Sequence, residues 1–419
     1  MLLRLVVVST PGGRQMVYLG IDWAEAHHDV CLLDETGIRL DKARVPDGIE
    51  GLARIHELVG AHTVDPETVV VGIETDRGLL VQGLVATGYQ VYALNPFAVS
   101  RYRDRHTVSR AKSDPGDAKV LAELVRTDRQ NHRQVAGDSE LAESLKVLAR
   151  THQTLVWARV RHANQLRSTL REFYPAALDA LGTDLAGRDA LALLGRAPTP
   201  EQGRQLSLTQ LRTVLERGGR ERGVAARAAA LQRALRTPQL QPPARLASAY
   251  GSSVRALVRV LGEFNAQIAT LEAELAEAFE DHPDAEILRS LPGLGVVLGA
   301  RVLAEFGDDR TRYENARARR CYAGSAPITR ASGTRLVVLA RVARNRRLAD
   351  ALYMWAFCAL TRSAGARAYY AAQRARGHTH HQALRALANR LVGILHGCLE
   401  HRCSYSETVA WPSLAQVAA

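Results

Sequence analysis

Two short apolar runs, each ending in an acidic residue, constrain the fold of this chain more than any other feature. The first run, residues 17–21, leads into Asp22, and the second, residues 69–73, leads into Glu74. Continuous runs of valine, isoleucine and leucine of this length predict buried β-strands. Asp22 and Glu74 therefore stand at strand ends, where a fold can bring them together. Taken alone, each acid is also explained as a solvated surface charge.

A third segment adds two more acids. Asp114 and Asp117 stand three residues apart at the start of a helical pattern, so their side chains share one helix face. Pro115 fits the first helical position, which makes Asp114 the expected N-cap. Carboxylates on two strand ends and a nearby helix can hold two Mg²⁺ ions about 4 Å apart, and such a pair clamps the oxygens of a phosphodiester. The predicted metal ligands are Asp22, Glu74, Asp114 and Asp117, and the alternative is that they are caps and surface charges.

The first part of the chain alternates strand and helix signals. Strands are expected at 17–23, 30–34, 38–44, 69–74 and 90–94, and helices at 49–60, 79–87 and 118–126. Three meandering strands followed by alternating helices and strands is the order of a ribonuclease H-like (RuvC-like) α/β domain, expected over residues 16–130. In that order the first and fourth strands are neighbours, which would bring the two acids together. Residues 1–15 are expected to be an extension with little structure.

The charge of the chain is strongly positive and unevenly distributed. It carries 55 lysines and arginines against 43 aspartates and glutamates, a formal net charge of +12. Residues 310–320 hold five arginines and residues 335–347 hold five more. Guanidinium groups match phosphate geometry, so this clustering predicts a nucleic-acid partner. A coding bias toward arginine would explain the preference for arginine but not the clusters. The arginines expected to bind nucleic acid are Arg317, Arg319, Arg320, Arg335, Arg341, Arg344, Arg346 and Arg347.

Residues 131–285 are expected to form a helical linker. Six apolar residues between Leu257 and Leu275 follow a 4-3-4-3-4 spacing, the seam of a coiled coil about three heptads long. We expect this coiled coil to join subunits into a dimer or tetramer. One core-facing helix of a bundle is the alternative.

The last domain is expected at residues 286–400, mostly helical, with a tail at 401–419. Its first segment, residues 288–295, resembles the hairpin of a helix-hairpin-helix. Gly293 and Gly295 would let backbone N–H groups approach a phosphate there. A plain helix–helix turn is the alternative.

Cysteine spacing and hydropathy argue against a zinc-binding protein and a membrane protein. The five cysteines show no CxxC pair, and Cys398 and Cys403 are too loosely spaced for a zinc knuckle despite the nearby His396 and His401. An odd count without a framework indicates reduced thiols in a cytoplasmic protein. No apolar stretch approaches 18 residues, so no membrane span is expected.

Six short segments in order carry a family resemblance. They are residues 18–22 (YLGID), 72–75 (GIET), 93–96 (ALNP), 113–118 (SDPGDA), 291–295 (LPGLG) and 322–327 (YAGSAP), followed by Ser332-Gly333. In this order the chain resembles the insertion-sequence-110 family, the DEDD-type transposases that also use a serine. The resemblance spans about residues 16–400.

The resemblance implies a DNA recombinase with a divalent metal, Mg²⁺. The family's four acids fall on Asp22, Glu74, Asp114 and Asp117, and its nucleophilic serine falls on Ser332. The resemblance also implies an element-encoded guide RNA and a bacterial, nucleoid-associated location. The acids and the serine are more than 200 residues apart, which suggests a site assembled from two subunits.

Two departures from the family pattern qualify the resemblance. Ser325 stands where the family has an aliphatic residue, so we interpret it as structural. The family's Gly-Asn pair followed by Leu-Arg is here Arg344-Asn345 followed by Leu348-Ala349. Asn345 remains an expected nucleic-acid contact.

Two other functions fit the same residues. A metal-dependent junction resolvase would use water as its nucleophile, and Ser332 would then only shape a loop. A non-catalytic nucleic-acid-binding protein would use the acids as caps. A covalent protein–DNA adduct separates the recombinase from the resolvase, and sensitivity of cleavage to a chelator separates both from the binding protein.

Overall fold

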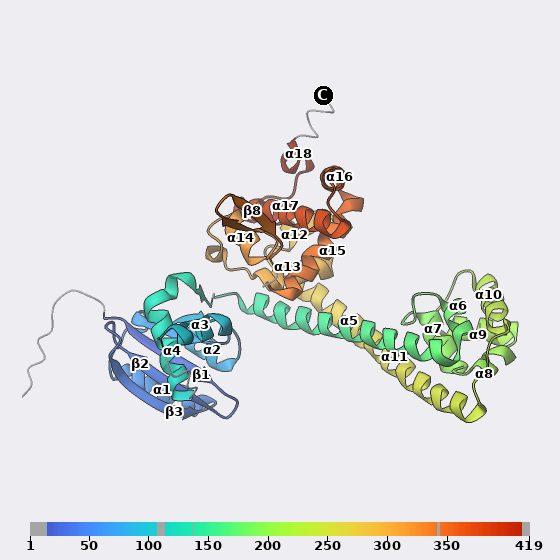
Figure 1. The fold of residues 1–419 in the computed structure, drawn as a ribbon, viewed down its shortest axis with the longest axis horizontal. Helices are drawn as coiled ribbons and strands as arrows, with labels where there is room; N and C mark the ends of the chain where they lie inside the picture. Colours follow the sequence, from blue (N-terminus) through green and yellow to red (C-terminus); the bar gives the residue numbers. More distant parts are fainter. Residues whose placement is uncertain (1–14, 107–113, 136, 342–343, 413–419) are drawn as a thin grey trace, which may run out of the picture. The chain divides into compact units, whose positions relative to one another are not determined.

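The computed structural model describes residues 15–106, 114–135, 137–341 and 344–412 (Figure 1). It consists of two compact units, residues 1–137 and 138–419. The expected extension therefore lies almost entirely outside the described residues. Within the described residues, no helix is both long enough and apolar enough to span a membrane.

The first unit is built on a six-stranded mixed sheet with the strand order β3-β2-β1-β4-β5-β6. The strands are β1 (Val17–Trp23), β2 (His27–Leu33), β3 (Arg39–Pro46), β4 (Val69–Ile73), β5 (Gln90–Ala93) and β6 (Arg133–Gln134). β1 pairs in parallel with β4, which confirms the expected neighbours, and the first three strands form an antiparallel meander. Sequence reasoning did not predict β6, because two residues are too few to show a periodicity.

Helices cover both faces of this sheet (Figure 1). Val17, Leu19 and Ile21 of β1 pack with α1 (Ile49–Gly60) and α2 (Leu79–Ala86). Tyr18 of β1 lies on the opposite face, with α3 (Pro96–His106) and α4 (Asp114–Asp128). Because successive strand residues point to opposite faces, an apolar run in which every residue is buried requires helices on both sides.

The second unit is mostly helical. Its first half contains α5 (Glu140–Phe173), α6 (Pro175–Leu181), α7 (Arg188–Arg196), α8 (Pro200–Gln205), α9 (Leu208–Arg217), α10 (Val224–Arg236) and α11 (Ala244–Glu280). Its second half contains α12 (Ala285–Ser290), α13 (Val296–Phe306), α14 (Ala316–Tyr322), the hairpin strands β7 (Ile328–Ser332) and β8 (Arg335–Leu339), α15 (Arg346–Arg362), α16 (Ala364–Ala375), α17 (His380–Glu400) and α18 (Glu407–Ala410). Two separate hydrophobic cores result, one around α6 to α10 and one around α12 to α17.

The heptad stripe lies inside the chain rather than between subunits. Leu261 is fully buried in the same core as Leu166 of α5, and Leu275 is buried in the same core as Leu145, near the other end of α5. α5 and α11 therefore run antiparallel and cover each other's apolar faces (Figure 1). The expectation that this stripe joins subunits is wrong, because a helix from the same chain already covers it.

Leu261→Ala should destabilise the second unit by about 2–5 kcal/mol, because it leaves a cavity where the side chain is fully buried. Val260→Ala on the same helix is the matched control. Val260 is 40% exposed, so its loss should change stability by less than about 0.5 kcal/mol. Urea unfolding followed by circular dichroism measures both. Equal effects would contradict the intramolecular packing of the stripe.

The expected loose tail is ordered as far as Trp411. Trp411 is buried, and its ring lies so close to Gly365 that a Cβ there would come within 2.1 Å of it. Glu407 accepts hydrogen bonds from the backbone N–H of Gly365 (2.6 Å) and from Ser363 Oγ (2.9 Å). Within the expected tail, Tyr405, Glu407 and Trp411 are therefore held against the second unit, because the tryptophan is buried in its core. Residues 413–419 lie outside the described chain.

Candidate active site

The parallel pairing of β1 and β4 places the first two acids side by side. Ile21 is in register with Ile73, and the next residues along the two strands are Asp22 and Glu74. Neighbouring strands lie about 4.8 Å apart, so the two backbone positions are adjacent at one edge of the sheet. Asp22 is half-buried and Glu74 is exposed. This edge can therefore present two carboxylates to a ligand in solvent.

Two glycines determine how closely α4 approaches these strands. Gly20 and Gly72 are in register, each two residues before an acid, so they lie on the same face of their strands as Asp22. A Cβ on Gly20 would lie 1.9 Å from the carbonyl oxygen of Ala118, and one on Gly72 would lie 2.6 Å from that of Leu121. The backbone of α4 therefore rests directly on the sheet. The start of α4 is thereby drawn toward the edge where the two strands end.

Asp117 lies in the first turn of α4 and is only 7% exposed. Its Oδ1 forms an ion pair of 2.7 Å with Nη2 of Arg103 on α3, a partner that sequence reasoning missed. The sequence did not indicate this role for Arg103, because other arginines of α3 look the same in sequence. α4 begins at Asp114, which makes Asp114 the first helical residue rather than the expected N-cap. The side chain of Asp114 lies outside the description.

A fifth acid, Asp29, was not predicted. It is the cross-strand partner of Asp22 on β2, so the two side chains lie on the same face of the sheet. Asp29 is buried and accepts two hydrogen bonds from the guanidinium of Arg44, at 3.2 and 2.7 Å. The fork of Arg44 neutralises this carboxylate, so Asp29 acts in the strand pairing and leaves the edge to Asp22 and Glu74.

The donor chemistry of this edge suits a hard divalent cation, since carboxylate oxygens are the ligands that Mg²⁺ prefers. Among the described side chains, no group of three or more acids, histidines or cysteines is close enough together to hold a metal. In the structure, the carboxylate of Asp117 is engaged by Arg103. A complete four-acid metal centre therefore remains a prediction.

Gly20→Ala should displace α4 and disrupt the first unit, since the new Cβ would meet backbone atoms 1.9 and 2.5 Å away. We expect a loss of about 3 kcal/mol or more in stability, measured by thermal unfolding. Gly60→Ala is the control. Gly60 is the last residue of α1 with nothing within 4 Å of a new Cβ, so stability should stay the same or rise by up to about 1 kcal/mol. Equal tolerance of both changes would contradict the proposed contact.

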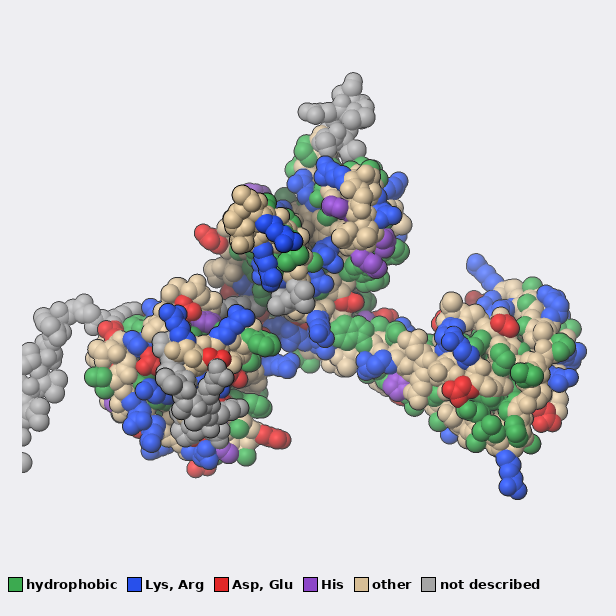
Figure 2. Space-filling view, viewed as in Figure 1, with side chains coloured by type: hydrophobic (Ala, Val, Ile, Leu, Met, Phe, Trp, Pro, Cys, Tyr) green, Lys and Arg blue, Asp and Glu red, His purple; other side chains and the backbone are tan. Residues whose placement is uncertain are grey.

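Ser332 lies at the tip of an exposed β-hairpin in the second unit. In Figure 2, Lys and Arg side chains gather over the region that Figure 1 labels β8. It is the last residue of β7 and pairs with Arg335, the first residue of β8, across a two-residue turn. Gly333 occupies the first turn position with φ 56°, which favours glycine and suits such hairpins. Sequence reasoning expected Ser332 in a loop. The strand assignment corrects this, and the exposed position leaves the hydroxyl accessible.

Three residues expected to contact nucleic acid instead hold the second unit together. Arg319 is only 6% exposed and its guanidinium lies over the rings of Tyr313 (4.5 Å) and Phe306 (5.3 Å). Burial lowers its pKa below the ordinary arginine value. Its position assigns Arg319 to packing within the protein. The other two, Asn345 and Arg347, surround a buried carboxylate.

That carboxylate belongs to Glu305, which is 4% exposed. Asn345 caps α15 and its Nδ2 donates to Glu305 Oε2 at 2.6 Å, while Arg150 Nε donates to Oε1 at 2.8 Å. Burial favours a higher pKa, but the hydrogen bond and charge of Arg150, with Asn345 and Arg347, hold the pKa of Glu305 below its ordinary value. Arg347 also lies 5.2 Å from the ring of Trp157. We therefore interpret this network as structural.

The remaining expected contacts differ in exposure. Arg317, Arg335, Arg344 and Arg346 are exposed, and Arg320 and Arg341 are half-buried. Of the two hairpin glycines, Gly293 packs against α15, since a Cβ there would lie 2.6 Å from the backbone nitrogen of Ala359. Gly295 is exposed at the N-terminus of α13. Ser325 is buried, and its Oγ donates to Asn389 Oδ1 at 3.0 Å, which supports a structural role.

Comparisons with known proteins match segments in both units of the chain. A family model described as "Transposase" matches residues 19–175, and one described as "Transposase IS116/IS110/IS902 family" matches residues 285–371. The mini-circle putative transposase for IS117 of Streptomyces coelicolor is 47% identical over 96% of this chain and 98% of its own length. The chain belongs to the IS110 family of transposases.

Two further relatives cover nearly the whole of this IS110-family transposase. The uncharacterized 44.8 kDa protein of insertion element IS116 from Streptomyces clavuligerus is 31% identical over 92% of the chain and 95% of its own length. The uncharacterized 43.6 kDa protein of insertion element IS110 from Streptomyces coelicolor is 29% identical over 93% of the chain and 95% of its own length. The function of the family is DNA transposition, and the first family match contains all four predicted acids, while the second contains Ser332.

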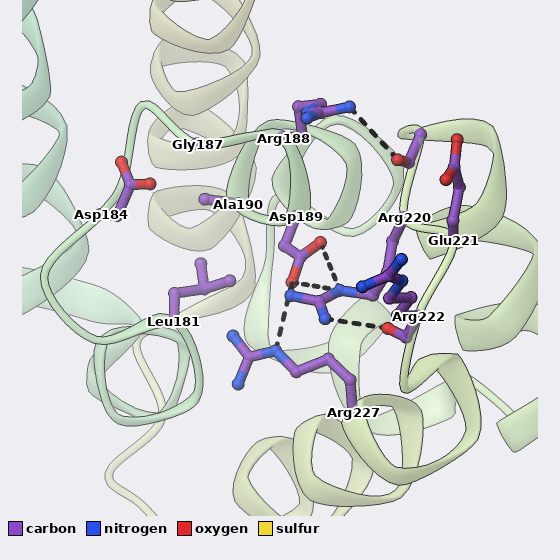
Figure 3. Close-up of a pocket in the computed structure, with 11 residues that line it drawn as sticks. Leu181, Asp184, Gly187, Arg188, Asp189, Ala190, Arg220, Glu221, Arg222 and Arg227 are labelled. Carbon is purple, nitrogen blue, oxygen red and sulfur yellow. Dashed lines mark hydrogen bonds and ion pairs between the residues drawn. The ribbon is translucent and has the colours of Figure 1, made fainter.

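The part of the transposase between the two family matches holds an arginine-lined pocket of about 580 Å³ (Figure 3). Asp189 at the start of α7 accepts hydrogen bonds from Arg220 at 2.7–3.0 Å and from Arg227 at 3.3 Å. The hydrogen bond from Arg220 lowers the pKa of Asp189. Arg188 donates to a backbone carbonyl, as Figure 3 shows. Because Asp189 is hydrogen-bonded to both Arg220 and Arg227, we interpret the cluster as a brace for the loop before α10.

Proposed function

We propose that this transposase cuts and rejoins DNA through a covalent serine–phosphate intermediate. Ser332 is the nucleophile, and Asp22, Glu74, Asp114 and Asp117 hold a divalent metal, Mg²⁺. The first unit has the ribonuclease H-like (RuvC-like) fold in this proposal. The observation that carries it is the parallel register of β1 and β4, which places Asp22 and Glu74 side by side at an open sheet edge.

The chemistry of the serine balances without an outside reactant. Ser332 Oγ loses its proton and forms a bond to phosphorus, while one strand's P–O bond breaks and the leaving oxygen takes up a proton. Rejoining reverses these steps, because a hydroxyl from another strand attacks the same phosphorus and releases Ser332. The phosphoester bond is conserved throughout, so no nucleotide cofactor is required.

Different residues would bind the metal and attack the phosphate. A bound Mg²⁺ would neutralise phosphate charge and ease deprotonation of a hydroxyl. Ser332 is exposed at a hairpin tip, so a DNA strand can reach its Oγ without rearrangement of the core. The four acids contribute oxygen ligands and no proton transfer.

The partners follow from charge and family membership. The net charge of +12 supports binding of DNA and of an element-encoded guide RNA, which would select the target by base pairing. Arg317, Arg335 and Arg346 are exposed in the second unit and available for phosphate contacts. A homo-oligomer, a dimer or tetramer, remains part of the proposal, but it must use a surface other than the buried heptad stripe.

Reconstitution tests the proposed function directly. The protein is incubated with its element ends, the flanking RNA and Mg²⁺, and the products are separated on denaturing gels. The proposal requires joined DNA and a protease-sensitive protein–DNA adduct, both lost with a chelator. Chelator-sensitive cutting without any adduct would support the resolvase with water as nucleophile. Binding without cutting would support a non-catalytic protein.

A further inference from the structure

A cavity of about 230 Å³ lies at the base of the hairpin that carries Ser332. Ser325, just before β7, and Arg344, shortly after β8, line one part of it. Tyr353 of α15 and His381 and Arg385 of α17 line the rest. The volume is many times the roughly 30 Å³ occupied by a water molecule in the liquid and below the usual range of drug-sized pockets. A compact polar group suits this space.

Two arginines meet at this cavity without a balancing acid. Among the described residues, neither Arg344 nor Arg385 has a carboxylate within the 4.0 Å of an ion pair, and all residues lining the cavity are neutral or basic. Burial lowers the pKa of Arg344, and the nearby charge of Arg385 lowers it further. Two like charges beside one cavity repel each other, and a bound anion would offset that repulsion.

The backbone holds Arg344 in place at this position. Gly324 has φ 65°, and a Cβ there would lie 2.4 Å from Cβ and 2.8 Å from Cδ of Arg344. The aliphatic part of Arg344 therefore packs on the bare backbone of Gly324, which fixes the start of the side chain at the wall of the cavity. Arg385 lies one helical turn after His381, so both occupy the same face of α17. Tyr353 OH and His381 Nδ1 are 3.0 Å apart, which orients the imidazole.

We propose that Arg344 and Arg385 clamp a backbone phosphate of the DNA strand in this cavity. The clamp rests on the proposed function, because it gives a second point of attachment to the DNA strand that Ser332 attacks. Ser325 precedes Ser332 by seven residues of mostly extended chain, which spans at most roughly 23 Å. A phosphate held at the hairpin base would therefore orient a strand that extends toward the hairpin tip.

The pocket around Asp189 provides a contrast within the same chain. There Asp189 forms ion pairs with both Arg220 and Arg227, and Asp184 and Glu221 add two more carboxylates to the pocket lining. At the hairpin base the two arginines have no such partner among the described residues. This difference in charge balance, rather than the number of arginines, favours the smaller cavity as the phosphate site.

The test measures binding without chemistry, in Ser332→Ala protein with a chelator present. Arg344→Gln combined with Arg385→Gln should weaken binding of element-end DNA about 10-fold or more, and should lower the slope of log affinity against log salt by about one. Arg376→Gln, an exposed arginine at the end of α16 in the same unit, is the matched control and should stay within about twofold. A neutral methylphosphonate at the clamped position of the DNA should weaken wild-type binding and leave the double variant unchanged.

Three outcomes would overturn the clamp. Unchanged affinity and salt slope in the double variant would remove the strand contact. A similar loss for an element RNA, with DNA binding intact, would assign the cavity to RNA instead. Stabilisation of the wild type by inorganic phosphate over chloride at equal ionic strength, with unchanged DNA binding, would indicate a free-phosphate site.

The experiment distinguishes an effect on the clamp from an effect on folding or on catalysis. Relief of the repulsion between the two arginines should leave the thermal midpoint of the double variant equal or higher, whereas a purely structural role would lower it. Because binding is measured in the Ser332→Ala background, failure of the clamp leaves the nucleophile untouched. Failure of the nucleophile, seen as cutting by the Ser332→Ala protein, leaves the binding result intact.

Discussion

Ser332→Ala should abolish recombination and the covalent protein–DNA adduct, with a loss in rate of at least about 10³-fold. The change removes the only atom that would bond to phosphorus, and loss of a nucleophile is among the largest single effects in enzymes. Ser332 is exposed, so the stability of the protein should change by less than about 0.5 kcal/mol. Adduct formation on labelled DNA, followed by denaturing electrophoresis, measures the first effect, and thermal unfolding measures the second.

Thr334→Ala is the matched control for the nucleophile. Thr334 lies in the same two-residue turn and is also exposed, so the Thr334→Ala substitution removes a hydroxyl from the same hairpin tip. Its activity should stay within a few-fold of wild type. If Ser332→Ala cut DNA at the normal rate in a chelator-sensitive reaction, water would be the nucleophile. Comparable losses in both variants would point to the shape of the hairpin instead.

Asp22→Asn or Glu74→Gln should each reduce strand cleavage by more than about 100-fold while nucleic-acid binding is retained. Loss of an outer-shell partner already costs 10- to 100-fold at metal sites, so loss of a ligand should exceed that. Asp22 is half-buried and Glu74 is exposed, and both substitutions leave the ion pairs of Asp29 with Arg44 and of Asp117 with Arg103 in place. Cleavage is measured across a Mg²⁺ titration and binding at a fixed salt concentration.

Asp76→Asn is the control for the acids, because Asp76 is exposed and stands two residues after Glu74. It should retain near-normal cleavage. Asp117→Asn is less informative, since it also breaks the pair with Arg103 and should cost stability. Normal recombination by the Asp22→Asn protein would remove the metal site from the proposal.

The α/β pattern of the first unit was predictable because its signals are local. Every residue of the apolar run before Asp22 is buried, and such a short run rich in valine, leucine and isoleucine is typical of a strand between two helical layers. The parallel pairing of β1 with β4 followed from element order and is confirmed. The bounds of α1, residues 49–60, were also correct, since a glycine ends the helix. β6 was missed because it is short and its neighbour is distant in sequence.

Side-chain roles in the second unit could not be predicted in the same way. An arginine that stacks on Tyr313 and one that faces solvent look identical in sequence, so Arg319 and Arg317 differ only in what folds over them. Ser332 could be proposed from the family resemblance, but its place at a hairpin tip required the pairing of β7 with β8. The cavity between the hairpin base and α17 could not be predicted, because residues more than 30 positions apart in the sequence line it together.

The sequence by itself determined the first five strands of the first unit, which acids stand at strand ends, and that the chain is basic, because periodicity and composition are properties of neighbouring residues. Tertiary structure decided which surfaces are covered. The heptad stripe of α11 is compatible with a partner subunit or with another helix of the same chain, and α5 covers it. Burial depends on what else the chain brings to a surface, so only long-range packing separates a binding arginine from a structural one.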